Sequence, residues 1–592
     1  MDSNTFDQVL VVIVIILALI LFAWGRWRYD IVATSALLVL AAARIIPTDQ
    51  VFNGFGNPAV ITVAAVMVVS RGMWNAGAAD ALAAALAGLG DRLLMPVITG
   101  VTAFISAFVD DTGTTGIMMP VAIQLARKNE QSPSKVLMPI AFASLLGGCI
   151  TLIGTPANIL VAGFRRQATG EPFGLFDFTP VGLSLTLAGL VFIWLIGWRL
   201  VPVRRSKGGK DELFEIADYL TEVAVPKESP FVKKTVSELE KALQEDVLIL
   251  GIVRGKRRLP VLSRLEPLRA GDVLIVEADA NSLKALLETS KFVLAAEKDL
   301  AKKFLVSAEI GMVEGVIGAG SQLVGRTLAQ MNLRRFYGAN VLAVSRQGHR
   351  HKGRLSGFRL QSGDVLLFQG GTESLGTVLD RLGCLPLAKR SLRIDKPTRV
   401  VTAVLIFSGV VLLPAFGILP VQVAFTAGAV LMVLCGIINA RELYENVDWP
   451  LIVLLGAFIP VGEAMQSSGI TRSIANAFLP VAGQLPHVVS LGVVLAGTLL
   501  LSNIINHTAA AMVMAPIAIG IAQGFGASVD PFLMAVAVGV SSSFLTPIGH
   551  QANTLVMGPG GYAFGDYWRL GLPLSLLVVG LAPFLIKMFW PF

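Results

Sequence analysis

Charged residues are scarce in this chain. They make up 15% of its 592 residues, whereas 54% of the residues are hydrophobic and the mean hydropathy is +0.70. A soluble globular protein could not cover its surface with so few polar side chains. We therefore expect an integral protein of the cell (inner) membrane that crosses the bilayer many times.

Cysteine and the common catalytic motifs are also scarce or missing. The three cysteines, Cys149, Cys384 and Cys435, are scattered, which excludes a disulfide framework or a cysteine-based metal site. The sequence contains no G-x-S-x-G, H-E-x-x-H or P-loop motif. We therefore expect neither an enzyme nor a resident cofactor. Without a P-loop, an ion gradient is the expected energy source for any transport.

The charges that are present lie mostly in the middle of the chain. About 55 of the 88 charged residues fall between positions 203 and 398, with a net charge of about +9. Basic residues mark both ends of this segment, which predicts a cytoplasmic domain inserted between two membrane halves. No clustered basic helix or aromatic platform accompanies them, so we expect no nucleic-acid partner.

The first apolar span predicts the orientation. It covers Phe6–Trp24, has no Lys or Arg before it and is followed by Arg26 and Arg28. This is not the pattern of a cleaved signal peptide. The positive-inside rule places the N-terminus outside and the Arg26/Arg28 turn in the cytoplasm.

The inserted segment is a tandem repeat with an offset of 92 residues. The turn Ala270-Gly271-Asp272 and the strand after it recur as Ser362-Gly363-Asp364 and its strand. Each copy predicts a short helix, β-strands separated by Gly-Asp turns, and a final helix. Because each Gly-Asp pair precedes a buried strand, we expect a structural role for it.

The membrane halves also carry a repeat. Thr151-Leu-Ile-Gly-Thr-Pro-Ala-Asn158 matches Thr546-Pro-Ile-Gly-His-Gln-Ala-Asn553, and the tripeptide Asp110-Asp-Thr112 upstream matches Asn506-His-Thr508. Polar segments broken by Gly or Pro at matching places in two apolar halves indicate a duplicated transporter. Such broken helices place free backbone dipoles around a site near the membrane midplane.

These motifs resemble those of the divalent anion/sodium symporter family of the ion transporter superfamily. The inserted repeats resemble RCK C-terminal (potassium-uptake regulator C-terminal) domains, some of which dimerise or bind a small cytosolic ligand. The resemblance implies an α-helical polytopic protein with inverted repeats and re-entrant hairpins. It also implies a homodimer with an elevator mechanism, and one substrate site between the hairpin tips with flanking sodium sites. The predicted domains are membrane half 1 (1–202), two RCK C-terminal-like domains (203–299 and 300–397) and membrane half 2 (398–592).

The chemistry of the repeated segments suits a small dianion and a coupling cation. Hydroxyls, amides and helix N-termini can bind the oxygens of a dianion without holding it too tightly. Carbonyl, Asn and Asp oxygens at broken-helix ends bind sodium. The candidate substrate-binding residues are Thr112, Asn158, Asn506, Thr508, His550 and Asn553. The candidate residues for sodium or proton coupling are Asp110, Asp111, Thr151, Gly154, His507, Thr546 and Gly549. The candidate sodium ligands are Asp110, Asp111, Asn158, Asn506 and Asn553.

The tripeptides depart from the family's usual Ser-Asn-Thr, because only Thr112 and Thr508 are kept. The repeat makes Asp111 and His507 equivalent, so a twofold relation would let them face each other. Three interpretations stay open: a proton-responsive pair, a strengthened sodium ligand at Asp110 or Asp111, and a static ion pair.

Two functions follow from these patterns. The first is sodium-coupled import of a small divalent anion, sulfate-like before dicarboxylate. The alternative is a cation/proton antiporter of the same superfamily in which Asp111 and His507 carry protons. A gated channel suits a duplicated site at the midplane less well, because such a site favours alternating access.

Overall fold

The computed structural model divides the chain into two compact units. The membrane unit comprises Met1–Arg204 and Ser391–Phe592, and the inserted unit comprises Arg205–Arg390. The structure describes residues 3–592 except for 25, 78–90, 130, 204–219, 244–247, 255–256, 261–266, 278–285, 295–309, 319–320, 332, 347–348, 352–354, 356, 372–373, 388–396, 446, 471–472 and 474–485.

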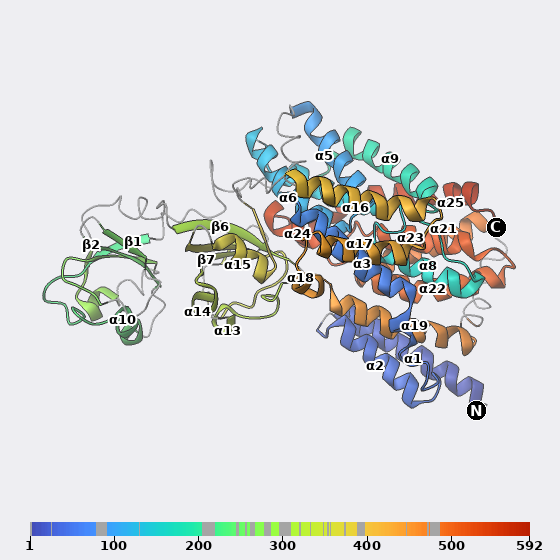
Figure 1. Cartoon of the computed structure of the whole chain (residues 1–592), viewed down its shortest axis with the longest axis horizontal. Coiled ribbons are helices and arrows are strands. Elements are labelled where there is room, and N and C mark those ends of the chain that lie inside the picture. The colour runs from blue at the N-terminus through green and yellow to red at the C-terminus, as the bar shows by residue number, and fades with distance from the viewer. Residues whose placement is uncertain are drawn as a thin grey trace. The chain divides into compact units, whose positions relative to one another are not determined.

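The described part of the membrane unit consists of helices in two halves with matching order (Figure 1). The first half contains α1 (Ser3–Trp24), α2 (Tyr29–Ala42), η1 (Asn53–Gly56), α3 (Pro58–Asn75), α5 (Asp91–Ser106), α6 (Asp111–Lys128), α7 (Ser134–Gly148), α8 (Pro156–Thr169), α9 (Thr179–Leu195) and η2 (Gly197–Arg199). The second half contains α16 (Pro397–Ala415), α17 (Val421–Leu434), α18 (Ala440–Glu445), α19 (Trp449–Ser467), α21 (His487–Ile504), α22 (His507–Gly524), α23 (Val529–Ser541), α24 (Gln551–Gly560), η3 (Phe564–Asp566) and α25 (Tyr567–Phe589).

Several of these helices have the length and composition of membrane spans. Among the described residues, five are long and apolar enough to cross a bilayer: Phe6–Trp24, Pro58–Asn75, Trp449–Ser467, His507–Gly524 and Phe564–Phe589. Other apolar helices have 10–17 residues, fewer than the roughly 20 needed for a full crossing. The result is consistent with the predicted polytopic membrane protein. The two predicted re-entrant hairpins cover residues 82–109 and 470–506, and their residues 82–90, 471–472 and 474–485 lie outside the described residues.

The two halves interlock. Within each half, α5 packs on α7 and α21 packs on α23, while α8 packs on α22 and α23 of the other half and α24 packs on α6 and α7. Small residues permit the close approach, because a β-carbon at Gly147 would overlap the carbonyl oxygen of Ala103 across the α5–α7 contact. Helix α8, which follows α7, and helix α24, which follows α23, therefore each pack against helices of the opposite half.

Two contacts of different chemistry fasten this interlock. Arg165 of α8 forms an ion pair with Asp530 of α23, with Nε 2.8 Å from Oδ1. The hydroxyl of Tyr562, just after α24, donates to the carbonyl of Ser134 and accepts from the backbone N–H of Met138 in α7. Each half is therefore tied to the other by its own repeated segment.

The inserted unit contains two five-stranded antiparallel sheets with the same topology. The first has the order β3-β2-β4-β1-β5 and the second, in corresponding order, β8-β7-β9-β6-β10. Both sheets carry a register shift at equivalent places, between Ile249 and Gly251 and between Val341 and Ala343. The strands are β1 (Leu220–Ala224), β2 (Leu248–Arg254), β3 (Arg257–Pro260), β4 (Val273–Glu277), β5 (Val293–Leu294), β6 (Ile310–Ile317), β7 (Asn340–Arg346), β8 (His349–Arg350), β9 (Val365–Gly371) and β10 (Cys384–Pro386). The described helices are α10 (Val236–Leu243), α13 (Leu328–Met331), α14 (Leu333–Tyr337) and α15 (Leu375–Leu382).

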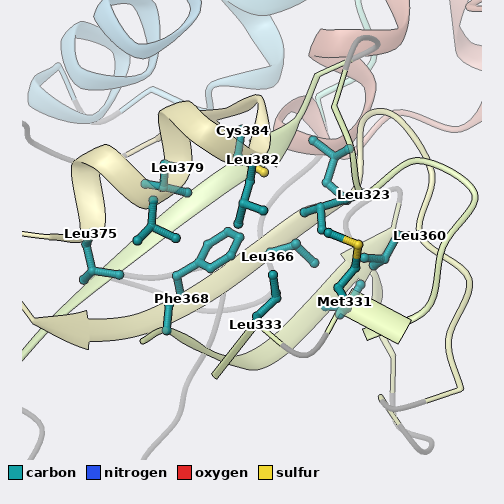
Figure 2. Close-up of a cluster of buried hydrophobic side chains, with 14 residues drawn as sticks. Leu323, Met331, Leu333, Leu360, Leu366, Phe368, Leu375, Leu379, Leu382 and Cys384 are labelled. Carbon is teal, nitrogen blue, oxygen red and sulfur yellow. The ribbon is translucent and has the colours of Figure 1, made fainter. Parts of the chain in front are cut away.

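Each sheet of the inserted unit has its own apolar core. Figure 2 shows the second, in which Leu366 and Phe368 of β9 lie beneath Leu375 and Leu379 of α15. These side chains alternate along the strand and recur every three to four residues along the helix, as burial on one face requires. The cysteine of this copy, Cys384, belongs to the same core.

The Gly-Asp turns hold the sheets together. Asp272 is almost fully buried and pairs with Arg254 at 2.8 Å, while Asp364 pairs with Arg346 at 2.7 Å. Each carboxylate also accepts a backbone N–H, Arg269 in the first copy and Gln361 in the second, which satisfies it further. The structural role predicted for these turns agrees with the geometry.

Candidate functional site

The polar tripeptides begin α6 and α22. Asp110 Oδ2 accepts hydrogen bonds from the backbone N–H groups of Thr112 at 3.1 Å and Gly113 at 3.3 Å. Asn506 Oδ1 accepts from Thr508 N–H at 2.9 Å. Both side chains are N-caps, which is why the chain changes from apolar to polar here. Each tip therefore presents a helix N-terminus, the partly positive end of the backbone dipole.

Asp111 sits beside Asp110 but in a different environment. Its Oδ1 accepts from Ser106 Oγ at 2.7 Å, and the neighbouring Ser144 donates to its backbone carbonyl at 2.8 Å. Gly148 of α7 packs directly against the carboxylate: a β-carbon there would lie 2.8 Å from Oδ2 and closer still to Oδ1. The carboxylate is fully buried, so the glycine is needed to accommodate it.

A histidine of the other half lies next to that carboxylate. His550 Nε2 is 3.3 Å from Asp111 Oδ2, and both side chains are about 1% exposed. His550 also caps α24, because its Nδ1 accepts from the N–H of Ala552 at 3.2 Å. A nitrogen that accepts carries no hydrogen, so a neutral His550 carries its hydrogen on Nε2, facing Asp111.

His507 takes a different place from the one we expected. Its ring stacks on that of His550, with centroids 4.2 Å apart and planes 26° apart. The imidazole that contacts Asp111 therefore belongs to His550, and His507 is joined to the carboxylate through it. The reason is the interlock: α24 packs on α6 and brings its N-cap to Asp111. Whether any of the three carries protons stays a prediction.

The repeated asparagines make the same contacts in both halves. Asn158 Nδ2 donates to the carbonyls of Gly148 at 3.0 Å and Thr151 at 2.9 Å. Asn553 Nδ2 donates to those of Ser543 at 2.7 Å and Thr546 at 3.2 Å. In both halves the accepting residues lie ten and seven positions upstream. Each amide thus closes the irregular segment between two helices into a loop.

The repeated threonines and glycines attach these loops to the tips. Thr151 Oγ1 donates to the carbonyl of Ala107, and Thr546 Oγ1 donates to that of Asn503 at 2.7 Å. Gly154 lies so close to the tip that a β-carbon would be 2.9 Å from the carbonyl oxygen of Ser106. At Gly549 a β-carbon would be 2.6 Å from the carbonyl oxygen of Ser502. Both positions therefore need glycine for the same reason.

Four polar atoms of the candidate site residues have no hydrogen-bond partner among the described residues. They are buried, although a polar atom in such a position normally has a partner. One belongs to each repeated asparagine, and the other two belong to the Asp111–His550–His507 cluster. The atoms are Asn158 Oδ1, Asn553 Oδ1, Asp111 Oδ2 and His507 Nδ1. For Asp111 Oδ2 the nearby His550 is an electrostatic neighbour at 3.3 Å without good hydrogen-bond alignment.

Comparison with known proteins decides the family. The citrate transporter family model matches residues 19–539. The chain belongs to the citrate transporter family. An uncharacterized transporter of Synechocystis sp. is 33% identical over 98% of this chain and 96% of its own length. An uncharacterized transporter of Escherichia coli is 28% identical over 97% and 98%. A probable sodium/sulfate cotransporter of Chlamydomonas reinhardtii is 20% identical over 99% and 89%.

Membership of the citrate transporter family confirms the predicted ion transporter superfamily and a transport function. The RCK C-terminal-like identity of the inserted sheets stays a prediction. The structure brings the predicted residues of this family member together in the membrane unit, at the two tips and the two loops. Of these, Asp110, Thr112, Asn506 and Thr546 are half-buried and the others are buried.

Sequence reasoning missed a layer of serines and one asparagine beneath the tips. Ser106 and Ser144 contact each other at 2.9 Å under Asp111, and Ser502 and Ser543 contact each other at 2.8 Å in the second half. Asn503 Oδ1 accepts two backbone N–H groups of the second loop. The repeat offset of 396 residues that relates the tripeptides also maps Ser106 onto Ser502. That offset was a signal that could have found Ser106 and Ser502, whereas it relates Ser144, Ser543 and Asn503 to no matching polar residue.

Proposed function

We propose that this protein imports a small divalent oxyanion, sulfate-like before dicarboxylate, coupled to sodium. The proposal extends the family assignment with the chemistry of the site. Two helix N-termini and the threonine hydroxyls at the tips supply partial positive charge and donors for an oxyanion. Sodium and sulfate appear in the name of the Chlamydomonas relative, and that name concerns the relative alone.

The paired amide oxygens of Asn158 and Asn553 carry the proposal. The NH2 group of each amide donates to two backbone carbonyls. The oxygen of each amide is buried and has no hydrogen-bond partner among the described residues. A buried acceptor of this kind is costly unless something with positive charge binds it. Oxygen-rich sites at interrupted helices suit sodium. Two equivalent oxygens therefore favour two sodium sites, one in each half, with Asp111 Oδ2 as a further ligand of the first.

An elevator movement fits the interlock of the two halves. The site-bearing helices α6, α7, α8, α22, α23 and α24 pack on one another across the halves. The Arg165–Asp530 pair and the Tyr562 contacts fasten them. A block held in this way suits rigid movement against the remaining helices. We extend the proposal to a homodimer of this type in the inner membrane, with its N-terminus outside.

The inserted unit is proposed to be a pair of cytosolic RCK C-terminal-like domains that regulate transport. Its two sheets share strand order, register shift and Arg–Asp pairs. Such internal repetition suits a regulatory pair that dimerises or binds a small cytosolic ligand. Removal of the ligand or of the dimer contact would then alter the rate of uptake and leave substrate selectivity unchanged.

A second candidate function is cation/proton antiport. Asp111, His550 and His507 form a continuous buried chain of titratable groups, which is suited to proton transfer. In this reading, protons bound by the chain exchange for sodium. The importer is favoured because the antiporter leaves the two helix N-termini and the threonine hydroxyls at the tips without a role.

Uptake of labelled sulfate, succinate and citrate into proteoliposomes tests the proposal. We expect uptake of at least one anion only with an inward sodium gradient. Asn158→Ala and Asn553→Ala are expected to raise the sodium concentration for half-maximal uptake by about tenfold or more, as loss of one good ligand interaction implies. The control is Asn439→Ala, which removes an exposed amide before α18. Sodium-driven proton movement without uptake of any of the anions would replace the importer by the antiporter.

A further inference from the structure

The turn between α1 and α2 lies against the tip of α22. A cavity of about 240 Å³ separates them. Its walls include Arg26, Trp27, Arg28 and Tyr29 from the turn, and Asn506 and Ala509 from the start of α22. The cavity therefore adjoins the candidate substrate site through Asn506, which belongs to both. None of the four turn residues is part of the repeated motifs that identify that site.

The cavity wall contains two arginines, and the carboxylates of Asp30 and Asp448 both lie near one of them, Arg28. Arg28 forms a two-pronged pair with Asp30, with Nε–Oδ1 at 3.1 Å and Nη2–Oδ2 at 2.9 Å. Arg26 has no carboxylate partner among the described residues, and its guanidinium lies 5.6 Å from the ring of Trp24. One arginine is thus paired with a carboxylate, while the five N–H donors of the other face no carboxylate among the described residues.

The opposite wall adds groups that favour an anion. The N-terminus of α22, an 18-residue helix, opens at Asn506. The Oδ1 of Asn506 is occupied by Thr508 N–H, and no described residue accepts from its Nδ2. Trp27 and Tyr29, whose side chains each carry one hydrogen-bond donor, are also among the lining residues. Drug-sized ligands occupy about 300–1,000 Å³, so this smaller cavity suits a small oxyanion.

The membrane-topology role of the arginines does not account for this arrangement. Positive charge after the first span is expected from the positive-inside rule alone. That rule predicts only that positive charge lies near the cytoplasmic membrane face. Arg26 also lines a cavity whose opposite wall includes Asn506 at the start of α22. The turn in the matching place of the second half, residues 416–420, has the sequence Phe-Gly-Ile-Leu-Pro and no charge. The cationic turn therefore serves only one of the two tips.

We propose that Arg26, with Asn506 and the N-terminus of α22, forms an outer binding site for the transported oxyanion. In the predicted orientation the turn is cytoplasmic, so the site holds the anion beside the paired tips after it leaves them during import. The Arg28–Asp30 pair positions the turn. This inference rests on the proposed anion transport and adds Arg26 to the residues that determine its affinity.

The first test measures transport of labelled sulfate, succinate and citrate by the full-length protein in proteoliposomes, with the anion and sodium supplied on the face that carries Arg26, which the predicted orientation places in the cytoplasm. We expect Arg26→Gln to raise KM by about tenfold or more, as loss of a charged hydrogen bond implies. Vmax and the sodium requirement are expected to stay close to wild type. Arg26→Lys should restore part of the affinity because it keeps the charge. The control Arg44→Gln, an exposed arginine just after α2, should leave KM unchanged. A KM in Arg26→Gln within twofold of wild type, or an equal rise in both glutamine variants, overturns the proposal.

The second test reports binding without transport. Trp27 lies in the cavity wall, so sulfate should change its fluorescence, identified as the signal lost in Trp27→Phe. The same change should be absent in Arg26→Gln. A sulfate response in a protein that transports no anion would support the site and reject the proposed function. Sodium-coupled uptake, together with a Trp27 fluorescence that does not change with sulfate, succinate or citrate, would support the proposed function and reject the site.

Discussion

Gly148→Ala is expected to damage the site through the carboxylate of Asp111. The added β-carbon would lie 2.8 Å from Oδ2 and closer to Oδ1, below the 3.0 Å that real β-carbon contacts almost never undercut. The carboxylate must then move by several tenths of an ångström. That movement weakens its 2.7 Å hydrogen bond from Ser106 and its contact with His550.

The magnitude follows from these contacts. A hydrogen bond to a charged group contributes about 1.5–3 kcal/mol, while replacing glycine by alanine in a helix returns about 0.5–1 kcal/mol. We expect a net loss of about 1–2 kcal/mol in the free energy of unfolding. Thermal unfolding of the detergent-solubilised protein and sodium-dependent uptake are the assays. The matched control is Gly100→Ala in α5, where a β-carbon would meet nothing within 4 Å, and it should be neutral or stabilising.

A double-mutant cycle separates this mechanism from general helix disruption. Asp111→Ala removes the atoms that the new β-carbon would meet. Gly148→Ala should therefore cost much less stability in the Asp111→Ala background than in the wild type. Equal costs in the two backgrounds would refute the reasoning, and so would a Gly148→Ala protein as stable as Gly100→Ala.

Three further predictions concern the inserted unit. Lys233 has a left-handed backbone (φ +71°) at the position where the second copy has Gly325 (φ +78°). Lys233→Gly should therefore stabilise the first sheet by about 1 kcal/mol, measured by hydrogen exchange. Slower hydrogen exchange in Gly325→Lys than in the wild type would contradict this prediction. Burial raises the pKa of the Cys384 thiol to about 12. At pH 8 a maleimide should therefore label exposed Cys435 and leave Cys384 unlabelled until the inserted unit unfolds. If mass spectrometry detects rapid labelling of both cysteines, Cys384 does not lie in a buried core. Asp272→Asn removes the negative charge of a buried carboxylate that pairs with Arg254 at 2.8 Å. It should cost about 1–3 kcal/mol of stability, measured by pulse proteolysis of the full chain. Resistance equal to wild type would show that the charge of Asp272 is dispensable.

The sequence alone determined the composition class, the position of the insert and the repeated polar segments. These are local or periodic properties: charge scarcity, an offset of 92 residues in the insert and matching Gly/Pro-broken segments in the two halves. They sufficed to identify Asn158 and Asn553 as equivalent, because equivalent residues keep their spacing. The duplication also predicted that both tips would be polar, and the structure shows Asp110 and Asn506 as caps.

The tertiary structure decided which polar groups meet. Asp111 and His550 are 439 positions apart in the sequence, and they touch because α24 of one half packs on α6 of the other. A repeat pattern does not show whether a segment packs on its own half or on the other half. The sequence therefore suggested His507, the residue equivalent to Asp111 in the repeat, as the partner of Asp111. Likewise the cavity at Arg26 depends on α22 lying against the α1–α2 turn. Contacts of this kind follow from helix packing across the whole unit, and local spacing cannot encode them.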